Sequence, residues 1–389
     1  MTLKRQMPFR TLAGGGLALA AAMGIGRFAY TPILPAMQRA ADLSTAKAGV
    51  LASANYAGYL VGALLVATVP PGVARRRTIM GCLIAVAMTT GSMAATRDIV
   101  AWGVVRFLAG VASAGVFVLA SGSVLDALRR EGRASLSGWP FAGVGFGIAA
   151  SGLVVRGGAG MLGWRGDWLA LALVAAAVVY PCWRWLPHTY REAAPEGMGP
   201  LQGSVPRLAL TLLFTAYFLE GAGYIVTGTF LVAIVERTPG LRGAGTGVWI
   251  VVGLAGALSA VLWAMLAARI GYARALVLAY VAQACGILLP IFGGLGAAVT
   301  TAFLFGGTFL GISVLTLTHA GRLIPYGSAQ IIGLLTAAYG VGQIVGPVVA
   351  GNLAGGTRGF DPALIVASAT VFVGGVLLAL FQRFDPSHR

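Results

Sequence analysis

A single acidic residue, Glu220, stands inside the apolar stretch YFLEGAGYIVTGTF at residues 217–230. On a helix, Tyr217, Glu220, Tyr224 and Thr227 are spaced i, i+3, i+7 and i+10, so they share one face. A carboxyl group buried away from water favours its neutral form, because burial penalises the charge. Glu220 could therefore take up and release a proton, and it is the candidate proton-coupling residue. The alternative is a structural carboxylate, bonded permanently to tyrosine or threonine or paired with an arginine.

Two arginines also stand inside apolar stretches, Arg27 in GIGRFAYTPILPAM and Arg106 in VVRFLAGVASAG. Arginine does not lose its proton in proteins, so each buried guanidinium needs a lasting partner. Glu220 is the one acid deep within these stretches, so at least one arginine lacks a protein anion. The carboxylate of a bound small molecule could fill that gap. Backbone carbonyls, water and helix packing are the alternative partners.

The composition indicates that membrane helices carry these residues. The chain has 389 residues, of which 58% are hydrophobic and 10% charged, and its mean hydropathy is +0.86. Soluble domains carry roughly 25% charged residues. So little charge cannot cover a surface in water, and the apolar excess must face lipid. The net charge of +16 sits in short clusters between apolar runs, which argues against nucleic acid as a partner.

About twelve segments are long enough to cross a bilayer, which takes roughly 20 apolar residues. They are residues 11–37, 46–69, 78–96, 99–125, 134–155, 166–186, 207–235, 245–268, 273–293, 297–320, 328–353 and 361–382. If both termini lie on one side, the loops there hold 17 lysines and arginines, against 8 on the other side. This bias predicts that both termini are cytoplasmic and that the protein lies in a bacterial inner membrane.

The chain also reads as two related halves. GIG at residues 24–26 matches GAG at 221–223, and GVG at 143–145 matches GVG at 340–342, each 197 residues later. We expect a six-helix half at 1–186, a cytoplasmic central loop at 187–206 and a second six-helix half at 207–389. Two such halves are the architecture of alternating-access transporters, which bind their substrate between the halves. The repeat places Arg27 and Tyr224 at equivalent positions.

With twelve spans and a central loop, the chain resembles the major facilitator superfamily, an all-α membrane fold. The basic loop PPGVARRR after span two and its second copy, AARIGYAR, resemble the gating loops of that superfamily, although both have alanine where an acid is usual. The segments GIGRFAYTPILPAM, YFLEGAGYIVTGTF and YGVGQIVGPVVAG are most similar to its YbfB/YjiJ-like branch. The resemblance implies a gating role for Arg75, Arg76, Arg77, Arg269 and Arg274.

In that superfamily, spans one, four, seven and ten line a central cavity. Glu220 is about twelve residues into span seven, or roughly 18 Å deep, which is near the bilayer midplane. The resemblance therefore implies that the buried charges share one cavity. The residues expected to bind substrate there are Arg27, Arg106, Tyr30, Tyr217, Tyr224, Thr227, Asn55, Tyr59, Trp139, Trp249, Tyr339 and Gln343. For each aromatic residue, packing is the alternative.

The predicted function is secondary active transport of a small organic solute by alternating access. Proton-coupled efflux, an antiport, is the first expectation, and proton-coupled uptake of a small organic anion, a symport, is the alternative. No Gly-rich loop ending in Gly-Lys-Ser/Thr is present, which argues against an ATP-driven pump. No enzymatic activity, cofactor or metal is expected. The expected partners are the substrate, protons and the lipid bilayer, with no nucleic acid, and the expected state is a monomer.

Overall fold

The computed structural model describes residues 2–66, 69, 73–133, 136, 138–158, 163–186, 206–323, 328–354 and 359–384, and every regular element in these ranges is helical. The first seven helices are α1 (Thr2–Leu19), α2 (Tyr30–Ala40), α3 (Thr45–Val66), α4 (Val73–Ser92), α5 (Ile99–Arg130), α6 (Trp139–Gly158) and α7 (Gly163–Trp185). The others are α8 (Arg207–Arg237), α9 (Gly245–Ile270), α10 (Tyr272–Leu288), α11 (Gly294–Leu323), α12 (Ser328–Leu353) and α13 (Asp361–Phe381). The predicted all-α fold is confirmed.

Eleven of the spans in the described part of the chain are long and apolar enough to cross a membrane, with α1 and α2 counted as one span from Phe9 to Ala40. The twelfth predicted span is α4, which packs lengthwise against α5 and α7. Its first turns carry three consecutive arginines, Arg75 to Arg77. The predicted span begins at residue 78, but the helix begins at Val73 and includes the arginines.

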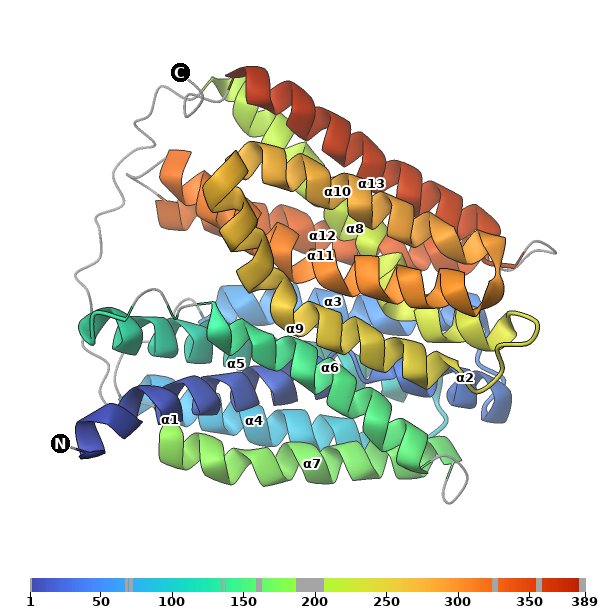
Figure 1. The fold of residues 1–389 in the computed structure, drawn as a ribbon. Coiled ribbons are helices and arrows are strands. Elements are labelled where there is room, and N and C mark those ends of the chain that lie inside the picture. The colour runs from blue at the N-terminus through green and yellow to red at the C-terminus, as the bar shows by residue number, and fades with distance from the viewer. Residues whose placement is uncertain are drawn as a thin grey trace.

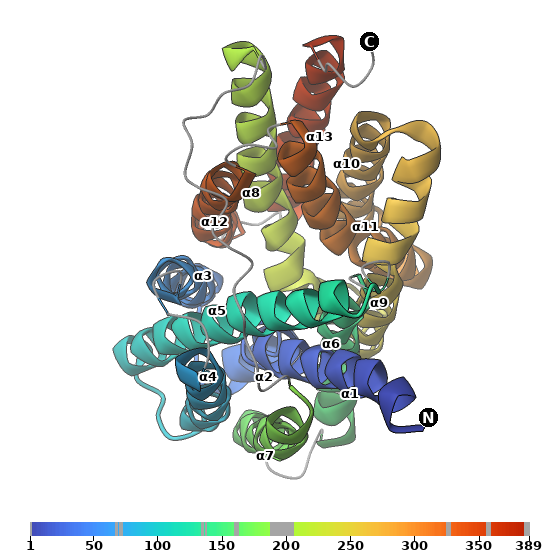
Figure 2. The ribbon, with the colours of Figure 1, turned by 90° about the vertical axis from the view of Figure 1, so that its left-hand side faces the viewer.

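The helices form two bundles, α1–α7 and α8–α13 (Figures 1 and 2). The first residues of α1 and the last residues of α13 lie at the same end of the molecule (Figure 1), which we name the termini end. We name the other one the far end. Residues 187–205 of the expected central loop lie outside the described residues, so the expected boundaries of the halves stay a prediction.

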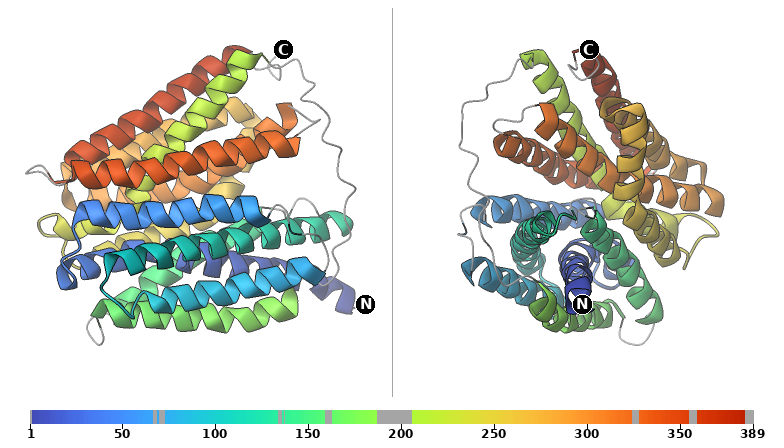
Figure 3. Two further views of the ribbon diagram at one scale, coloured as in Figure 1. Left: turned by 180° about the vertical axis from the view of Figure 1, so that it is seen from behind. Right: turned by 60° about the vertical axis from the view of Figure 1, so that its left-hand side comes forward.

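The two bundles meet toward the far end, where α2 packs on α8, α3 on α12 and α6 on α9 (Figure 3). Hydrogen bonds cross the junction from Thr31 to the carbonyl of Gly228 at 2.5 Å and from Ser53 to the carbonyl of Ile344 at 2.6 Å. Between α6 and α9, Gly145 lies directly against the α9 backbone, where a Cβ atom would not fit. These contacts hold the bundles together, and those between α6 and α9 continue toward the termini end, where Gly138 lies beside Val261.

The first span is not one continuous helix. After α1 comes a π-helix, η1 (Ala20–Ile25), then a turn at residues 26–29, and then α2. The amides of Gly26 and Phe28 bond back five residues, to Ala21 and Met23. Wide turns of this kind often mark functional sites, because they release backbone groups from the regular helical ladder. In this span the turn contains Arg27.

Candidate functional site

Arg27 is buried where α2 meets the second bundle. Its Nη2 donates a hydrogen bond to Oε1 of Gln343 on α12 at 2.6 Å. Its guanidinium carbon lies 4.7 Å from the ring centre of Tyr56 and 4.5 Å from that of Tyr59. Its Nε is buried without a hydrogen bond, and no carboxylate in the described ranges pairs with it. Arg27 is therefore a cation in an aromatic cage with unused donors.

Arg106 has a different set of partners. Its Nη1 and Nη2 donate to the carbonyls of Gly26 at 3.3 Å and of Arg27 at 3.1 Å, and its guanidinium lies over the ring of Tyr30 at 4.9 Å. Asn55 donates to the backbone carbonyl of Arg106 at 2.9 Å. The two bonds from the Arg106 guanidinium satisfy carbonyls in the break of the first span. The sequence left two kinds of partner open for a buried arginine, a substrate carboxylate or backbone carbonyls, and the partners of Arg106 are backbone carbonyls.

A row of tyrosines extends from Arg27 along the second bundle. Nε2 of Gln343 donates a short hydrogen bond to the hydroxyl of Tyr224. The ring of Tyr339 stacks on Tyr224 with centres 5.5 Å apart and on Tyr217 with centres 4.5 Å apart. The α8 and α12 backbones come this close because Gly342 lies directly against Phe218 and Ala222, leaving no space for a Cβ.

Glu220 is fully buried on α8, behind this row. The side chain of Gln283 on α10 lies beside its carboxyl group. Neither carboxyl oxygen makes a hydrogen bond of ordinary geometry with the described residues, and the same holds for the Gln283 amide. A buried polar group without a partner is costly, so the amide of Gln283 beside the Glu220 carboxyl offsets part of the cost of burying it.

The remaining predicted binding residues fall into two groups. Tyr30 and Thr227 are buried near the junction: the hydroxyl of Tyr30 donates to the carbonyl of Ala48 at 3.1 Å, and that of Thr227 has no hydrogen bond among the described residues. Trp249 is held within the α6–α9 junction, where its Nε1 donates to Ser151 at 3.3 Å. Trp139 is 52% exposed at the first residue of α6. Neither tryptophan is in contact with the Arg27 cage.

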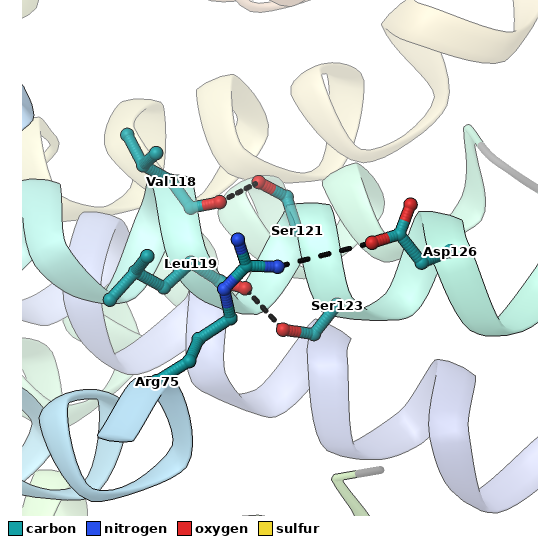
Figure 4. Close-up of polar contacts among 6 residues, drawn as sticks. All are labelled: Arg75, Val118, Leu119, Ser121, Ser123 and Asp126. Atoms are coloured by element: carbon teal, nitrogen blue, oxygen red, sulfur yellow. Dashed lines mark hydrogen bonds and ion pairs between the residues drawn. The ribbon is translucent and has the colours of Figure 1, made fainter. Parts of the chain in front are cut away.

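The predicted gating residues lie at helix ends, and two are tied to neighbouring helices. Figure 4 shows Arg75 on α4 beside Asp126 on α5, with 3.9 Å between Nη1 and Oδ2. Asp126 is thus an acid on another helix that pairs with the basic start of α4. Arg76 donates to the carbonyl of Trp183 on α7. Arg77, at the start of α4, and Arg269 and Arg274, on either side of the break at Gly271, are exposed.

A cavity of about 830 Å³ opens at the far end, beyond the junction. It is lined by Gln38, Arg39, Glu236, Arg237 and Arg242 among others. Arg237 donates across the bundles to Gln38 at 3.3 Å and Thr45 at 3.2 Å. These hydrogen bonds among Gln38, Thr45 and Arg237 join the two bundles at the far end.

Sequence reasoning missed three residues of the site: Tyr56 beside Arg27, and Gln283 and Tyr280 beside Glu220. Tyr280 and Gln283 are three residues apart on a helix, so they share a face. That pair on an otherwise apolar span was the available signal. Tyr56 had no comparable signal, because a tyrosine among small apolar residues is typical of packing.

The family described as "Uncharacterised MFS-type transporter YbfB" matches residues 19–379. The chain is 28% identical over 353 residues to a chloramphenicol resistance protein of Streptomyces lividans, covering 87% of this chain and 88% of that one. It is 22% identical over 384 residues to a gentisate transporter of Corynebacterium glutamicum, covering 94% and 86%.

Solved transporters share the fold. The nucleoside transporter NupG matches with a TM-score of 0.72 and 16% identity, over 99% of both chains. A bacterial homolog of the human lysosomal transporter Spinster, inward-facing and occupied, matches with a TM-score of 0.75 and 15% identity, over 99% and 98% of the two chains. These similarities bear on the fold alone. The chain belongs to the YbfB-like family of MFS-type transporters and is a multi-pass membrane protein.

Proposed function

We propose that this transporter carries small aromatic carboxylates across the inner membrane together with protons. The observation that carries the proposal is the Arg27 cage: a buried guanidinium with spare donors, a neutral amide as its hydrogen-bond partner and tyrosine rings around it. A carboxylate would give Arg27 a charge-assisted pair, roughly twice as strong as a neutral hydrogen bond. The rings would stack on an aromatic substrate. Gentisate, named for one relative, is an aromatic carboxylate.

The second part of the proposal is that Glu220 carries the proton. Arg27 and Glu220 have separate polar neighbours, Gln343 for the guanidinium and Gln283 for the carboxyl, so the anion and the proton would bind to different groups. An ionised Glu220 would repel a carboxylate across the apolar interior, whereas a protonated one would not. Binding of the proton thus raises the affinity for the anion, and binding of the anion raises the affinity for the proton by the same factor. This relation suits the symport alternative of the sequence analysis.

The proposed orientation places the termini end in the cytoplasm, as the loop charges predict. The bundles are joined toward the far end, so this conformation would open to the cytoplasm. Transport would require the far-end junction to separate and the cytoplasmic ends to close. We propose that the monomer performs this cycle in the lipid bilayer.

Proton-coupled efflux, the first expectation from the sequence, stays a second candidate. One observation favours it: the relative that is 28% identical is named a chloramphenicol resistance protein. Chloramphenicol is a neutral aromatic compound, so it would use the tyrosine row and gain little from Arg27. The two candidates therefore differ in their dependence on Arg27.

The test is ligand-dependent thermal stabilisation of the purified protein with gentisate, benzoate, chloramphenicol and tetraphenylphosphonium. A ligand at about 100 times its Kd stabilises the folded state by about 2.7 kcal/mol. We expect gentisate and benzoate to raise the Tm of the wild type, and Arg27→Ala to abolish the rise. Replacing the exposed Arg133 with alanine is the control for loss of one positive charge, and it should keep the rise.

Two outcomes would contradict the carboxylate proposal. Stabilisation by chloramphenicol or tetraphenylphosphonium alone would favour efflux. Stabilisation by carboxylates that survives Arg27→Ala would place the anion elsewhere. If Arg27→Ala does not fold, Arg27→Lys keeps the charge without the fork of donors, and it should retain weaker stabilisation by the same two carboxylates.

A further inference from the structure

A chain of three polar side chains joins the two bundles beside the buried carboxyl. Arg27 of the first bundle donates to Oε1 of Gln343, and Nε2 of the same amide donates to the hydroxyl of Tyr224. Both residues of the second bundle are buried. The amide oxygen of Gln343 is therefore bonded to Arg27, the proposed anion site, and its amide nitrogen is bonded to Tyr224 on α8.

Gln343 stands where a substrate carboxylate would stand. Its Oε1 accepts from Arg27 at 2.6 Å, which is the position of one oxygen of a carboxylate bound to the guanidinium. An amide oxygen is a neutral acceptor, so a carboxylate that reaches Arg27 would form the stronger bond. Substrate binding would then displace the amide, and both of its hydrogen bonds would change together.

Tyr224 is a neighbour of Glu220 on the same helix face. The two residues are four apart on the continuous helix α8, so their side chains are neighbours on one face. Tyr224 interacts electrostatically with Glu220 and also with Arg27. Other titratable groups that interact electrostatically with Glu220 are Tyr217 on α8, Tyr280 on α10 and Tyr339 on α12.

We propose that the Gln343–Tyr224 pair couples the anion site to Glu220, an inference that rests on the proposed function. While Nε2 of Gln343 donates to the Tyr224 oxygen, the tyrosine proton is directed away from the amide, and its dipole stabilises an ionised Glu220. When a carboxylate displaces the amide, the Tyr224 oxygen loses that donor and keeps Tyr339 alone, so its freed lone pair favours a protonated Glu220. The anion thereby draws a proton onto the carboxyl group.

The experiment measures gentisate affinity by calorimetry at mildly acidic and mildly alkaline pH, together with proton uptake on binding from a pH-indicator dye. Gentisate stays ionised across this range, so changes in affinity report on the protein. For the wild type we expect affinity roughly tenfold higher at acidic pH, within the usual range of coupling between sites. Tyr224→Phe keeps the ring and should reduce this ratio to about twofold or less, with proton uptake lost in parallel.

Tyr180→Phe is the control. It also removes one tyrosine hydroxyl, but Tyr180 is exposed on α7, in the other bundle from Glu220, and its ring packs on Trp183. The control should keep the wild-type ratio. If Tyr224→Phe kept the full ratio, or Tyr180→Phe lost it equally, the coupling role of the Gln343–Tyr224 pair would be overturned.

A failure of the proposed function gives a different result. In that case gentisate would not bind the wild type at either pH, or it would bind with equal affinity at both and without proton uptake. Either result overturns the carboxylate–proton proposal, and the coupling role with it, before any variant is compared. A Tyr224→Phe protein that does not fold is replaced by Gln343→Leu, which removes the same hydrogen bond from the other side and should also flatten the ratio.

Discussion

The two buried arginines, on the first and fourth spans, have different hydrogen-bond partners. Both terminal nitrogens of Arg106 donate to backbone carbonyls, and only its Nε is without a hydrogen bond to the described residues, so it has little left for a ligand. Arg27 has one neutral hydrogen-bond partner and rings on its faces. By residue type alone, both arginines are candidate anion sites. They differ in how many of their donors are already bonded to the protein.

The first residue-scale prediction concerns the proton. Glu220→Gln replaces the carboxyl with a neutral group of the same shape, so the site is fixed in a state that resembles the protonated one. We expect gradient-driven accumulation of gentisate in proteoliposomes to fall roughly tenfold, because the proton can no longer be bound and released. Exchange of internal for external gentisate should persist, since it requires no net proton movement.

The control for this variant is Glu131→Gln, which neutralises an exposed acid at the end of α5. It should accumulate gentisate as the wild type does. Full accumulation by Glu220→Gln would show that the coupling proton binds elsewhere. Loss of both accumulation and exchange would instead assign Glu220 to substrate binding or to the fold.

Much of the cluster could be predicted at this scale. Glu220, Arg27, Tyr224 and Gln343 stand out because polar groups in apolar segments need partners, and the structure brings them together. Trp139 and Trp249 could not be assigned, because an aromatic residue suits a cavity, a helix junction or lipid equally well and its type does not reveal the direction in which it faces.

At the scale of elements, the break in the first span positions the site. Proline has no amide proton, so Pro32 cannot continue a regular helix back to Phe28, and the amide of Thr31 bonds to that carbonyl instead. The wide turn before it exposes the carbonyls of Gly26 and Arg27 to Arg106. The sequence predicted one continuous span here, because hydropathy measures apolar length and is insensitive to a local change of helix type.

The element-scale prediction is that Arg106→Gln destabilises the fold around this break. Two buried carbonyls would lose their donors, at about 1–3 kcal/mol for each group. We expect a lower Tm in detergent and weaker gentisate binding, because Arg27 is part of the same turn. Arg129→Gln, at the exposed end of the same helix, should change neither quantity. An unchanged Tm for Arg106→Gln would mean that water or the neighbouring Asn55 replaces the guanidinium.

At the scale of the whole molecule, the junction between the bundles is built from separable contacts. Most of its hydrogen bonds are single bonds from a side chain to a carbonyl or to another neutral group, and Arg237 meets Gln38 and Thr45 without a carboxylate. Each such bond contributes only about 0.5–1.5 kcal/mol. Glycines let the backbones touch without interlocking side chains. A junction of this kind can open in a transport cycle, and its two-bundle form was predictable from the internal repeat.

The last prediction tests whether the far end must open. With Cys82, Cys182 and Cys285 replaced by serine, Gln38→Cys and Arg237→Cys place one thiol on each bundle, on the lining of the far-end cavity. A short, reducible thiol cross-linker should stop transport, because the bundles cannot separate, and reductant should restore it. Thr238→Cys with Arg242→Cys lies within one loop of the second bundle, so the same treatment should leave transport intact. Transport that continued through the Gln38–Arg237 cross-link would show that substrate passes without opening this junction, which would contradict alternating access and favour a channel-like path.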